Sequence, residues 1–425
     1  MPGAIAVLVA AGAIAAATIA WSAGSIAFPP LTQEAPPPTL AEIVPDQYIV
    51  VFKDDVGDVD AATSDAARRH GLSPQKTYRA ALKGFVAVIP AARLQEVKDD
   101  PRVAFVNEDR LVHASATSSN QPVQGVPTGV QRLNAPANAN TGAGIGVAVI
   151  DTGISLAHPD LSANIVANVN CVNSKKNGDD DNGHGTHVAG TIAALNNAIG
   201  VVGTAPGAKL AAVKVLSANG SGTWSQVICG IDWVTANAAK YNLKVANMSL
   251  GGVGANDNNC GLTNRDALHK AICRSRTAGV TYVVAAGNDG ANAAATVPAA
   301  YDDAVITVSA LADSDGKPGG LGAGTSYGPD DTFATFSNYG SVVDLGAPGV
   351  NILSTWLNGG YNKISGTSMA TPHVSASAAL YVKSHPGSTW TQVRDGLKAM
   401  AEPLNSGHTD PSGKHPEPIV KAGNL

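Results

Sequence analysis

Apolar runs recur along the second half of the chain and predict buried strands. They are GVAVI at 146–150, LAAVKVL at 210–216, VANMSL at 245–250 and VTYVVAA at 280–286. Strands with one face in water alternate apolar and polar residues, whereas uninterrupted runs are typical of strands covered on both faces. The pattern therefore predicts a mostly parallel sheet enclosed by helices.

Helical periodicity occurs between these runs. Val227, Ile231 and Val234 recur at the spacing of one helix face. The same spacing occurs within 267–272, ahead of Gly279, a residue type that commonly ends helices. This alternation predicts an α/β fold: a doubly wound, mostly parallel sheet with helices on both faces.

Residues 46–113 show a different pattern. Strands are expected at 48–52, 84–90 and 102–109, and short helices at 61–71 and 92–100. The order approximates β-α-β-β-α-β and predicts a small α+β, ferredoxin-like unit. The polar, turn-rich segment 113–129 that follows is typical of an exposed, cleavable linker.

The N-terminus is apolar and uncharged from 4 to 21, and Ser25 and Ala27 then supply the small residues that signal peptidases accept. We interpret 1–27 as a signal peptide and the Pro-rich stretch 28–45 as a linker. No Lys or Arg precedes the apolar run, and its length also permits an uncleaved anchor.

Composition excludes some partners. The 425 residues are 44% hydrophobic and 14% charged, with a net charge of −5, as in a globular protein without a basic surface. We therefore expect neither nucleic acid as a partner nor stable membrane association.

Cysteine usage indicates disulfides. The four cysteines are Cys171, Cys229, Cys260 and Cys273, and no C-x-x-C spacing suggests zinc. An even number in an apparently exported chain favours two disulfides, for which three pairings are possible.

Asp151 directly follows the run GVAVI. Ligands of such sheets bind at the carboxyl ends of the strands, where a buried acid needs a partner or loses its charge. A helix cap or turn role is the alternative for Asp151. The preceding GAGIG does not indicate a dinucleotide site, because its glycines come before the strand instead of after it.

His184 lies in NGHGTHVAGT between two glycines, which permit close backbone approach. His187 follows at H-x-x-H spacing, but the glutamate of the H-E-x-x-H zinc motif is absent, so we interpret His187 as structural.

Ser368 lies in GTSMATPH, just ahead of a small-residue run typical of a buried helix. A hydroxyl becomes a good nucleophile when a base takes its proton and an acid orients that base. Asp151, His184 and Ser368 provide this set and predict a catalytic triad. The elbow of α/β-hydrolases also has Gly-x-Ser, but its chain order is Ser, acid, His.

The motifs DTG, HGTHVAGT and GTSMATPH, in the order Asp, His, Ser, resemble those of the subtilisin-like serine proteases, specifically the proteinase K-like branch. The resemblance covers nearly the whole chain. It implies that 46–113 is a propeptide, acting as inhibitor and folding chaperone, and that 118–425 is the catalytic domain. It also implies that no catalytic cofactor is needed.

The resemblance extends to substrate binding. Asn288 falls where the family places the side-chain donor of its oxyanion hole, which the N–H of Ser368 completes; an ordinary turn is the alternative. Segments that match the family's substrate-binding strands and pocket contain Gly220, Ser221, Gly222, Ser249, Leu250, Gly251, Ala285, Ala286 and Gly287. Backbone pairing implies broad specificity, and the uncharged pocket implies a preference for apolar or aromatic side chains before the scissile bond.

Disulfides and metals also follow from the resemblance. It favours Cys260 with Cys273, which leaves Cys171 with Cys229. Structural calcium is expected at acidic loops, with Asp313, Asp315 and Asp344 as candidate ligands, and solvated surface acids are the alternative.

Together these features predict a secreted, monomeric serine endopeptidase that acts on proteins and peptides and is made as a self-processing precursor. Its own propeptide is expected to be its intramolecular inhibitor. A catalytically silent binding protein on the same fold is the rival, which the complete motifs and the retained propeptide disfavour.

Overall fold

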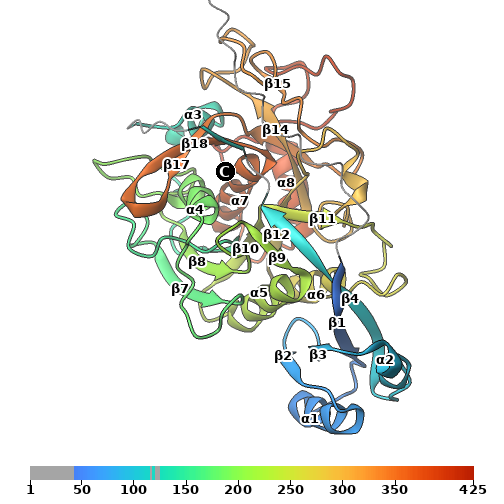
Figure 1. The fold of residues 1–425 in the computed structure, drawn as a ribbon. Helices are drawn as coiled ribbons and strands as arrows, with labels where there is room; N and C mark the ends of the chain where they lie inside the picture. The colour runs from blue at the N-terminus through green and yellow to red at the C-terminus, as the bar shows by residue number, and fades with distance from the viewer. Residues whose placement is uncertain (1–42, 115–116, 120–124) are drawn as a thin grey trace, which may run out of the picture. The chain divides into compact units, whose positions relative to one another are not determined.

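The computed structural model describes residues 43–114, 117–119 and 125–425 (Figure 1). The predicted signal peptide and nearly all of the Pro-rich linker lie outside these residues. No helix in the described ranges is both long and apolar enough to cross a membrane.

A mostly parallel sheet forms the centre of the larger part of the chain, in the order β15-β14-β12-β10-β6-β8-β7, with β16 beside β14 (Figure 1). Only β15 runs antiparallel to its neighbour. The strands are β6 (Gly146–Asp151), β7 (Ile165–Asn170), β8 (Lys209–Lys214), β10 (Leu243–Met248), β12 (Thr281–Ala285), β14 (Ile306–Ala312), β15 (Thr332–Phe333) and β16 (Leu345–Pro348).

Helices cover both faces of this sheet, which confirms the predicted fold class. They are α3 (Thr128–Arg132), α4 (His184–Ala193), α5 (Trp224–Asn237), α6 (Ala267–Arg276), α7 (Thr367–Ser384) and α8 (Trp390–Met400). Successive strand residues point to opposite faces. Accordingly Val147 and Val149 of β6 join the apolar cluster of α4 and α7, whereas Ala148 and Ile150 join that of α5 and α6.

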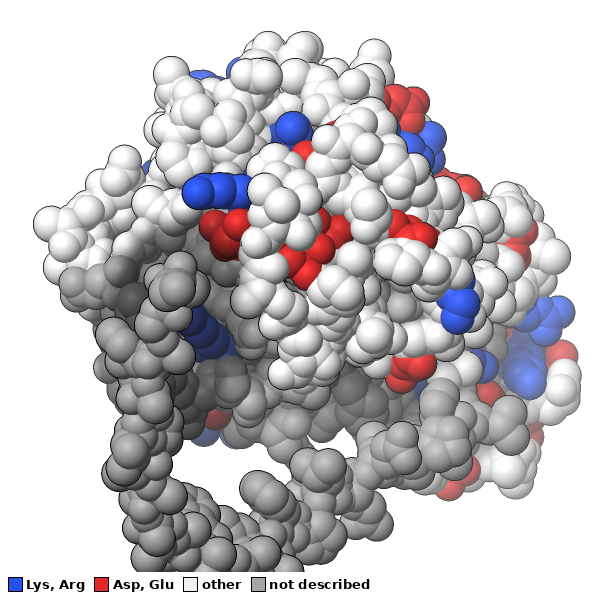
Figure 2. All heavy atoms as spheres, turned by 90° about the horizontal axis from the view of Figure 1, so that it is seen from above, with Lys and Arg blue, Asp and Glu red and all other residues white. Residues whose placement is uncertain are grey.

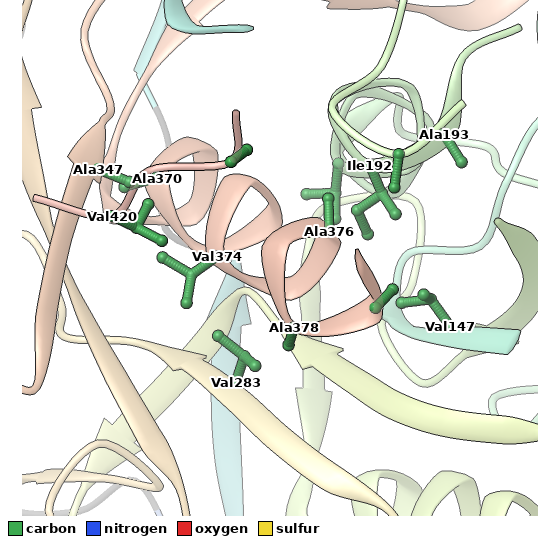
Figure 3. Packing of buried hydrophobic residues seen from close by; sticks show 14 of the residues in the cluster. Val147, Ile192, Ala193, Val283, Ala347, Ala370, Val374, Ala376, Ala378 and Val420 are labelled. Carbon is green, nitrogen blue, oxygen red and sulfur yellow. The ribbon is translucent and has the colours of Figure 1, made fainter. Parts of the chain in front are cut away.

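Small side chains let α7 lie close to the sheet and to α4. Figure 3 shows Val374 and Ala378 of α7 above Val283 of β12, and Ile192 of α4 beside Ala376. The helix is buried along most of its length, as the small-residue run predicts.

The N-terminal unit has the predicted β-α-β-β-α-β order. Its elements are β1 (Ile43–Phe52), α1 (Val59–His70), β2 (Pro74–Tyr78), β3 (Gly84–Val88), α2 (Ala91–Lys98) and β4 (Val103–Ala114). Asp58 caps α1 by accepting from the N–H of Ala61 at 2.9 Å, and Gly71 ends it at φ 61°. The polar strand β2 has no apolar pattern that sequence reasoning could use.

Four strands of the large sheet were not among the predicted runs, and one of them, β15, has only two residues. β7 lies at the edge and alternates in burial, while the fully buried β14 contains Thr307 and Ser309, which interrupt its apolar run. Thr307 is tolerated there because its hydroxyl donates to the carbonyl of Ala299 at 2.7 Å. β16 has only four residues.

The predicted linker 113–129 is partly wrong. β4 continues to Ala114, β5 (Thr117–Ser119) pairs with β18 (Tyr361–Ser365), and α3 begins at Thr128. Backbone pairing forms these strands from the N–H and C=O groups that any sequence carries.

One buried cation ties α3 to the C-terminal segment. Arg132 has no exposed side-chain surface; its Nε donates to Asp331 Oδ1 at 2.7 Å and its Nη2 to Glu402 Oε1 at 2.7 Å. Burial alone would raise the pKa of Glu402, but hydrogen bonds from His408 and Arg132 outweigh it and lower that pKa to about 2. The guanidinium of Arg132 thus bridges two carboxylates, and Lys421 also pairs with Glu402 at 3.4 Å.

Replacing Arg132 should therefore be costly. Arg132→Ala is expected to lower the free energy of unfolding by about 3–5 kcal/mol, because it leaves the buried carboxylate of Asp331 without its cation and removes one of the two cations beside Glu402. Urea unfolding on a Ser368→Ala background, which excludes self-digestion, measures this. Arg69→Ala, which breaks the exposed ion pair with Asp65, is the control and should cost about 0.5 kcal/mol or less. Equal effects of the two changes would contradict the structural role of Arg132.

Candidate active site

The predicted catalytic residues lie at the carboxyl edge of the sheet and at two helix starts. Asp151 is the last residue of β6, His184 the first of α4 and Ser368 the second of α7. All three are buried, and α4 packs against α7. The fold thus brings together residues that are far apart in sequence.

Asp151 and His184 form a direct pair. His184 Nδ1 lies 2.8 Å from Asp151 Oδ1, which also accepts from the N–H of Thr152 at 2.6 Å. Burial lowers the pKa of His184, but the charge of Asp151 and the hydrogen bond to it outweigh burial, so the pKa is raised. The pair leaves Nε2 of His184 buried and without a partner among the described residues.

Glycines on both sides of His184 make this approach possible. Gly183 has φ 108°, and a Cβ there would lie 2.5 Å from the Trp356 ring. A Cβ on Gly185 would lie 2.1 Å from the carbonyl oxygen of Gly153 and 3.1 Å from Asp151. The helix start can therefore meet the end of β6 only without these side chains.

Ser368 is held through its backbone. Pro372 lacks an N–H, so the carbonyl of Ser368 has no helical donor four residues on. It accepts instead from the Ser249 hydroxyl at 2.8 Å. The Ser368 hydroxyl donates to the carbonyl of Ser249 at 3.1 Å, so the structure shows no hydrogen bond between it and His184.

Asn288 follows β12 and is oriented by the residue before Ser368. Its Oδ1 accepts from both the N–H and the hydroxyl of Thr367, each at 2.8 Å. The amide Nδ2 has no hydrogen-bond partner among the described residues. It remains a free donor near the start of α7.

The end of the N-terminal unit lies between two of the predicted substrate-binding segments (Figure 1). β4 pairs antiparallel with β9 (Ser221–Thr223), with Val112 opposite Gly222. It also pairs with β11 (Leu250–Val253), with His113 opposite Gly251 and Ala114 opposite Leu250. Ser221, Gly222, Leu250 and Gly251 thus bind an extended chain through their backbone.

The remaining predicted substrate residues have other positions. Gly220 lies in the turn before β9 at φ 76°, and Ser249 lies against Ser368. Ala285 and Ala286 are buried at the end of β12, and Gly287 precedes Asn288. No described contact joins these last three residues to β4.

The disulfides join Cys171 to Cys229 and Cys260 to Cys273, the pairing that the family resemblance implies. His187 is fully buried, and its Nε2 lies 2.8 Å from the carbonyl of Ile352. Burial lowers the pKa of His187 to about 3. These contacts agree with a structural role for His187.

The candidate calcium ligands separate into two places. Asp313 and Asp315 lie together with Asp330, and their ligand atoms are within 4.8 Å of one another. Asp344 is not part of this group: it pairs with Lys398 at 3.2 Å and accepts from the N–H of Thr307 at 3.1 Å. The role of Asp344 as a calcium ligand therefore stays a prediction.

Sequence reasoning missed the supporting roles of Thr367 and Ser249. Thr367 orients Asn288 from 79 residues away, and the Ser249 hydroxyl holds the carbonyl of Ser368. Thr367 is adjacent to Ser368 in the sequence, but nothing in the sequence identifies its partner.

Comparison with known families identifies both parts of the chain. Residues 142–414 match the model of the subtilase family, and residues 47–115 match that of peptidase inhibitor I9. The order of the two matches is that of the N-terminal unit and the large α/β part.

Individual relatives agree with these family matches. Subtilisin NAT of Bacillus subtilis subsp. natto is 40% identical over 370 residues, which cover 85% of this chain and 86% of that protein. The extracellular serine proteinase of Thermus sp. (strain Rt41A) is 38% identical over 413 residues, 90% of this chain and 92% of that one. The solved structure of a cold adapted subtilisin-like serine proteinase aligns with a TM-score of 0.56 and 35% identity over 69% of this chain and 97% of its own. This chain therefore belongs to the subtilase family and is a serine endopeptidase with an N-terminal inhibitor domain.

Proposed function

We propose that this protein is a secreted endopeptidase of broad specificity whose precursor cuts itself after β4. The observation that carries the proposal is the position of β4 between β9 and β11, with the next strand, β5, beside β18. Thr117 of β5 lies opposite Ser365, three residues before Ser368. β4 thus ends beside Leu250, next to Ser249, which hydrogen-bonds Ser368, and β5 begins beside Ser365.

Ser368 is proposed as the nucleophile and His184 as its base. The hydroxyl turns from the carbonyl of Ser249 toward Nε2 of His184, the only ring nitrogen that Asp151 leaves free. Oγ attacks the peptide carbonyl as its proton passes to Nε2. The imidazolium, stabilised by Asp151, then protonates the leaving amine, and a water activated by the same His184 hydrolyses the acyl-enzyme.

The oxyanion is proposed to bind two fixed donors. Nδ2 of Asn288 is free because Thr367 holds the other end of the amide. The N–H of Ser368 lies in the first turn of α7, where backbone donors have no helical partner. Donors fixed before reaction stabilise the developing charge without reorganisation.

Substrates are proposed to bind as β4 does, by pairing their backbone with β9 and β11. Pairing through backbone groups makes few demands on side chains, which supports broad specificity. Leu250, Ala285 and Ala286 carry no charge, which supports an apolar or aromatic preference before the scissile bond.

The N-terminal unit is proposed to inhibit the enzyme and assist its folding, and its contacts are reciprocal. Asp109 of β4 accepts from the N–H of Ser225 at 2.8 Å, at the start of α5. Asp232 of α5 accepts from the N–H groups of Ala80 and Ala81, at 2.6 and 2.7 Å. Each part thus satisfies backbone donors of the other, which favours continued association after cleavage.

Secretion and processing complete the proposal. Two disulfides support an oxidising destination. We assign 1–27 to the signal peptide, 28–45 to the linker, 46–113 to the propeptide and 118–425 to a monomeric catalytic domain. Membership of the proteinase K-like branch stays a prediction from the motifs.

The main test is self-processing. Ser368→Ala should accumulate as a folded, uncut precursor, whereas the unaltered chain should appear as two associated pieces with the new N-terminus between Ala114 and Gln121. Ser377→Ala removes a hydroxyl from the same buried helix and should still be cut. N-terminal sequencing and gel analysis in a protease-deficient host measure both. Cleavage of Ser368→Ala at the normal rate would refute the assignment of the nucleophile.

Asn288 should act on kcat more than on KM. Asn288→Leu is expected to lower kcat by about 10²- to 10³-fold, a magnitude taken from the equivalent donor of subtilisin itself. Asn288→Asp keeps the acceptor for Thr367 but removes the donor, so a similar loss would assign the effect to Nδ2. Unchanged kcat in both variants would exclude the oxyanion role.

The loss of activity at low pH should be controlled by the protonation of His184. Hydrolysis needs neutral His184, so kcat/KM should fall as the pH drops through its pKa, which is held above its usual value. In Asp151→Asn burial still lowers this pKa but the opposing charge is gone, so the limb should move to lower pH while the plateau falls about 10⁴-fold. Asp179→Asn, a nearby acid that does not contact His184, is the control. A pH profile that Asp151→Asn leaves unmoved would contradict the pairing.

A further inference from the structure

Two cysteines, a histidine and an aspartate meet beside α6, on the opposite face of the sheet from α4 and α7. Cys260 precedes the helix, and His269 and Cys273 lie four residues apart on one of its faces. Asp303 lies in the turn before β14, and one ligand atom from each of the four residues lies within 4.8 Å of the others. Two thiolates, an imidazole and a carboxylate suit four-coordinate zinc. We call these four residues the α6 ligand group.

The α6 ligand group differs in kind from the acidic clusters of the surface. Figure 2 looks onto the end of the molecule that carries β15 and shows acidic side chains gathered in one part of a largely uncharged face. Carboxylates alone are the ligands of hard cations, whereas thiolates and imidazole select zinc and similar metals. The sulfur and nitrogen atoms beside α6 therefore indicate a different metal.

His269 is oriented as a zinc-binding histidine is. Its side chain is fully buried, with Nε2 2.9 Å from Asp303 Oδ1 and Nδ1 3.3 Å from Asp257 Oδ1. Zinc-binding histidines almost always direct their second ring nitrogen to a carboxylate, a carbonyl or water, which fixes the ring. Asp257 is itself held by the N–H groups of Asn259 and Gly261, each at 2.9 Å. Asp257 thus fixes the ring while Nε2 faces the ligand group.

The polar atoms of the group are incompletely satisfied by the chain. Neither ring nitrogen of His269 forms a well-oriented hydrogen bond within the described residues, and the buried Oδ1 of Asp303 forms none there either. Buried polar atoms without such partners cost free energy that a bound ion would recover. Cys260 and Asp303 are partly exposed, which gives an ion access to the group.

The disulfide and a metal compete for the same two sulfurs, so the site belongs to the chain before oxidation. Both cysteines are then thiols, and zinc binding releases their two protons and leaves two thiolates on the ion. A small disulfide, acting as oxidant, can later take two electrons from these thiolates. The Cys260–Cys273 bond forms, the oxidant takes up two protons to become two thiols, and Zn²⁺ is released.

Arg276 favours the thiolate form that zinc requires. Its Nη2 lies 3.3 Å from Cys273 Sγ and 3.6 Å from Cys260 Sγ. A guanidinium at this position stabilises a thiolate relative to a thiol. Two thiolates and Asp303 carry three negative charges, which one divalent ion and Arg276 together neutralise.

We propose that the α6 ligand group binds one zinc ion while the Cys260–Cys273 bond is open. Zn–S distances are about 2.3 Å and Zn–N and Zn–O distances about 2.0–2.2 Å, so the ligand atoms of one ion lie about 3.3–3.8 Å apart. A group whose atoms already lie within 4.8 Å needs only small side-chain movements to close around the ion. The ion would join α6 to the segments on either side of it, in the place that the disulfide takes after oxidation.

Metal binding by the full-length Ser368→Ala protein tests the proposal. A tertiary phosphine opens the disulfides: phosphorus takes the oxygen of one water, and the two hydrogens of that water go to the two sulfurs. The reduced, metal-free protein should bind one zinc ion by calorimetry, and the oxidised protein should not bind this ion. Cobalt, used as a second probe, should show the visible bands of tetrahedral coordination together with a thiolate charge-transfer band.

Single substitutions identify the ligands. Cys260→Ser and His269→Ala should each lose the zinc ion that the reduced parent binds. Asp257→Asn removes only the carboxylate behind the ring and should weaken zinc affinity about 10- to 100-fold. Cys171→Ser is the matched control, because it removes a cysteine of the other disulfide and should bind zinc as the parent does.

Folding is followed by circular dichroism in the same samples. If the reduced parent unfolds, zinc should restore its native spectrum, because binding to a site formed only in the folded chain stabilises that fold. Unfolding that zinc does not reverse would overturn the proposal, as would zinc binding by His269→Ala equal to that of the parent. If His269→Ala does not fold, the partly exposed Asp303 decides the question: unchanged zinc affinity in Asp303→Asn would overturn the site. Because every sample lacks the nucleophile, the result is independent of the proposed proteolysis.

Discussion

The buried charge of Asp151 constrains the catalytic edge of the sheet. Its side chain has no exposed surface, and its stability as an anion depends on His184 and the N–H of Thr152. This pairing requires α4 to start against the end of β6, which in turn requires glycine at 183 and 185. The same contact leaves Nε2 of His184 as the ring nitrogen without a partner among the described residues.

A second set of contacts holds the nucleophile through its backbone and its neighbours. Pro372 frees the carbonyl of Ser368 for Ser249, while Thr367 binds Asn288. The start of α7 is therefore joined to the ends of β10 and β12 by hydrogen bonds that leave the N–H of Ser368 and Nδ2 of Asn288 free. The hydrogen bonds that position Ser368 and Asn288 are thus the same ones that leave their two N–H donors available for a substrate.

Inhibition and substrate binding are proposed to use one surface. β4 completes a sheet with β9 and β11 as an extended substrate would, and the carboxylates of Asp109 and Asp232 extend the interface beyond the cleft. Backbone pairing would allow an inhibitor and substrates of different sequence to share these strands. The contacts outside the cleft distinguish the inhibitor from a substrate that leaves after cleavage.

The sequence alone determined the fold class, both units and the candidate triad. Strands buried on both faces are uniformly apolar, so the sequence pattern predicts them. Each triad residue lies in a glycine-containing motif, and the chemistry of a serine nucleophile explains why an acid, a base and a hydroxyl are all present. Strands stabilised mainly by backbone pairing, such as β2, β5 and β9, carry no such pattern and were missed or seen only through resemblance.

Only the tertiary structure decided the contacts between distant residues. It placed Thr367 against Asn288, Asp330 beside Asp313, and Lys398 against Asp344. It also showed the Ser368 hydroxyl turned to Ser249 instead of His184. Periodicity and motifs report the local environment of a residue, whereas its partners depend on how strands and helices pack, and that packing is set by the whole chain.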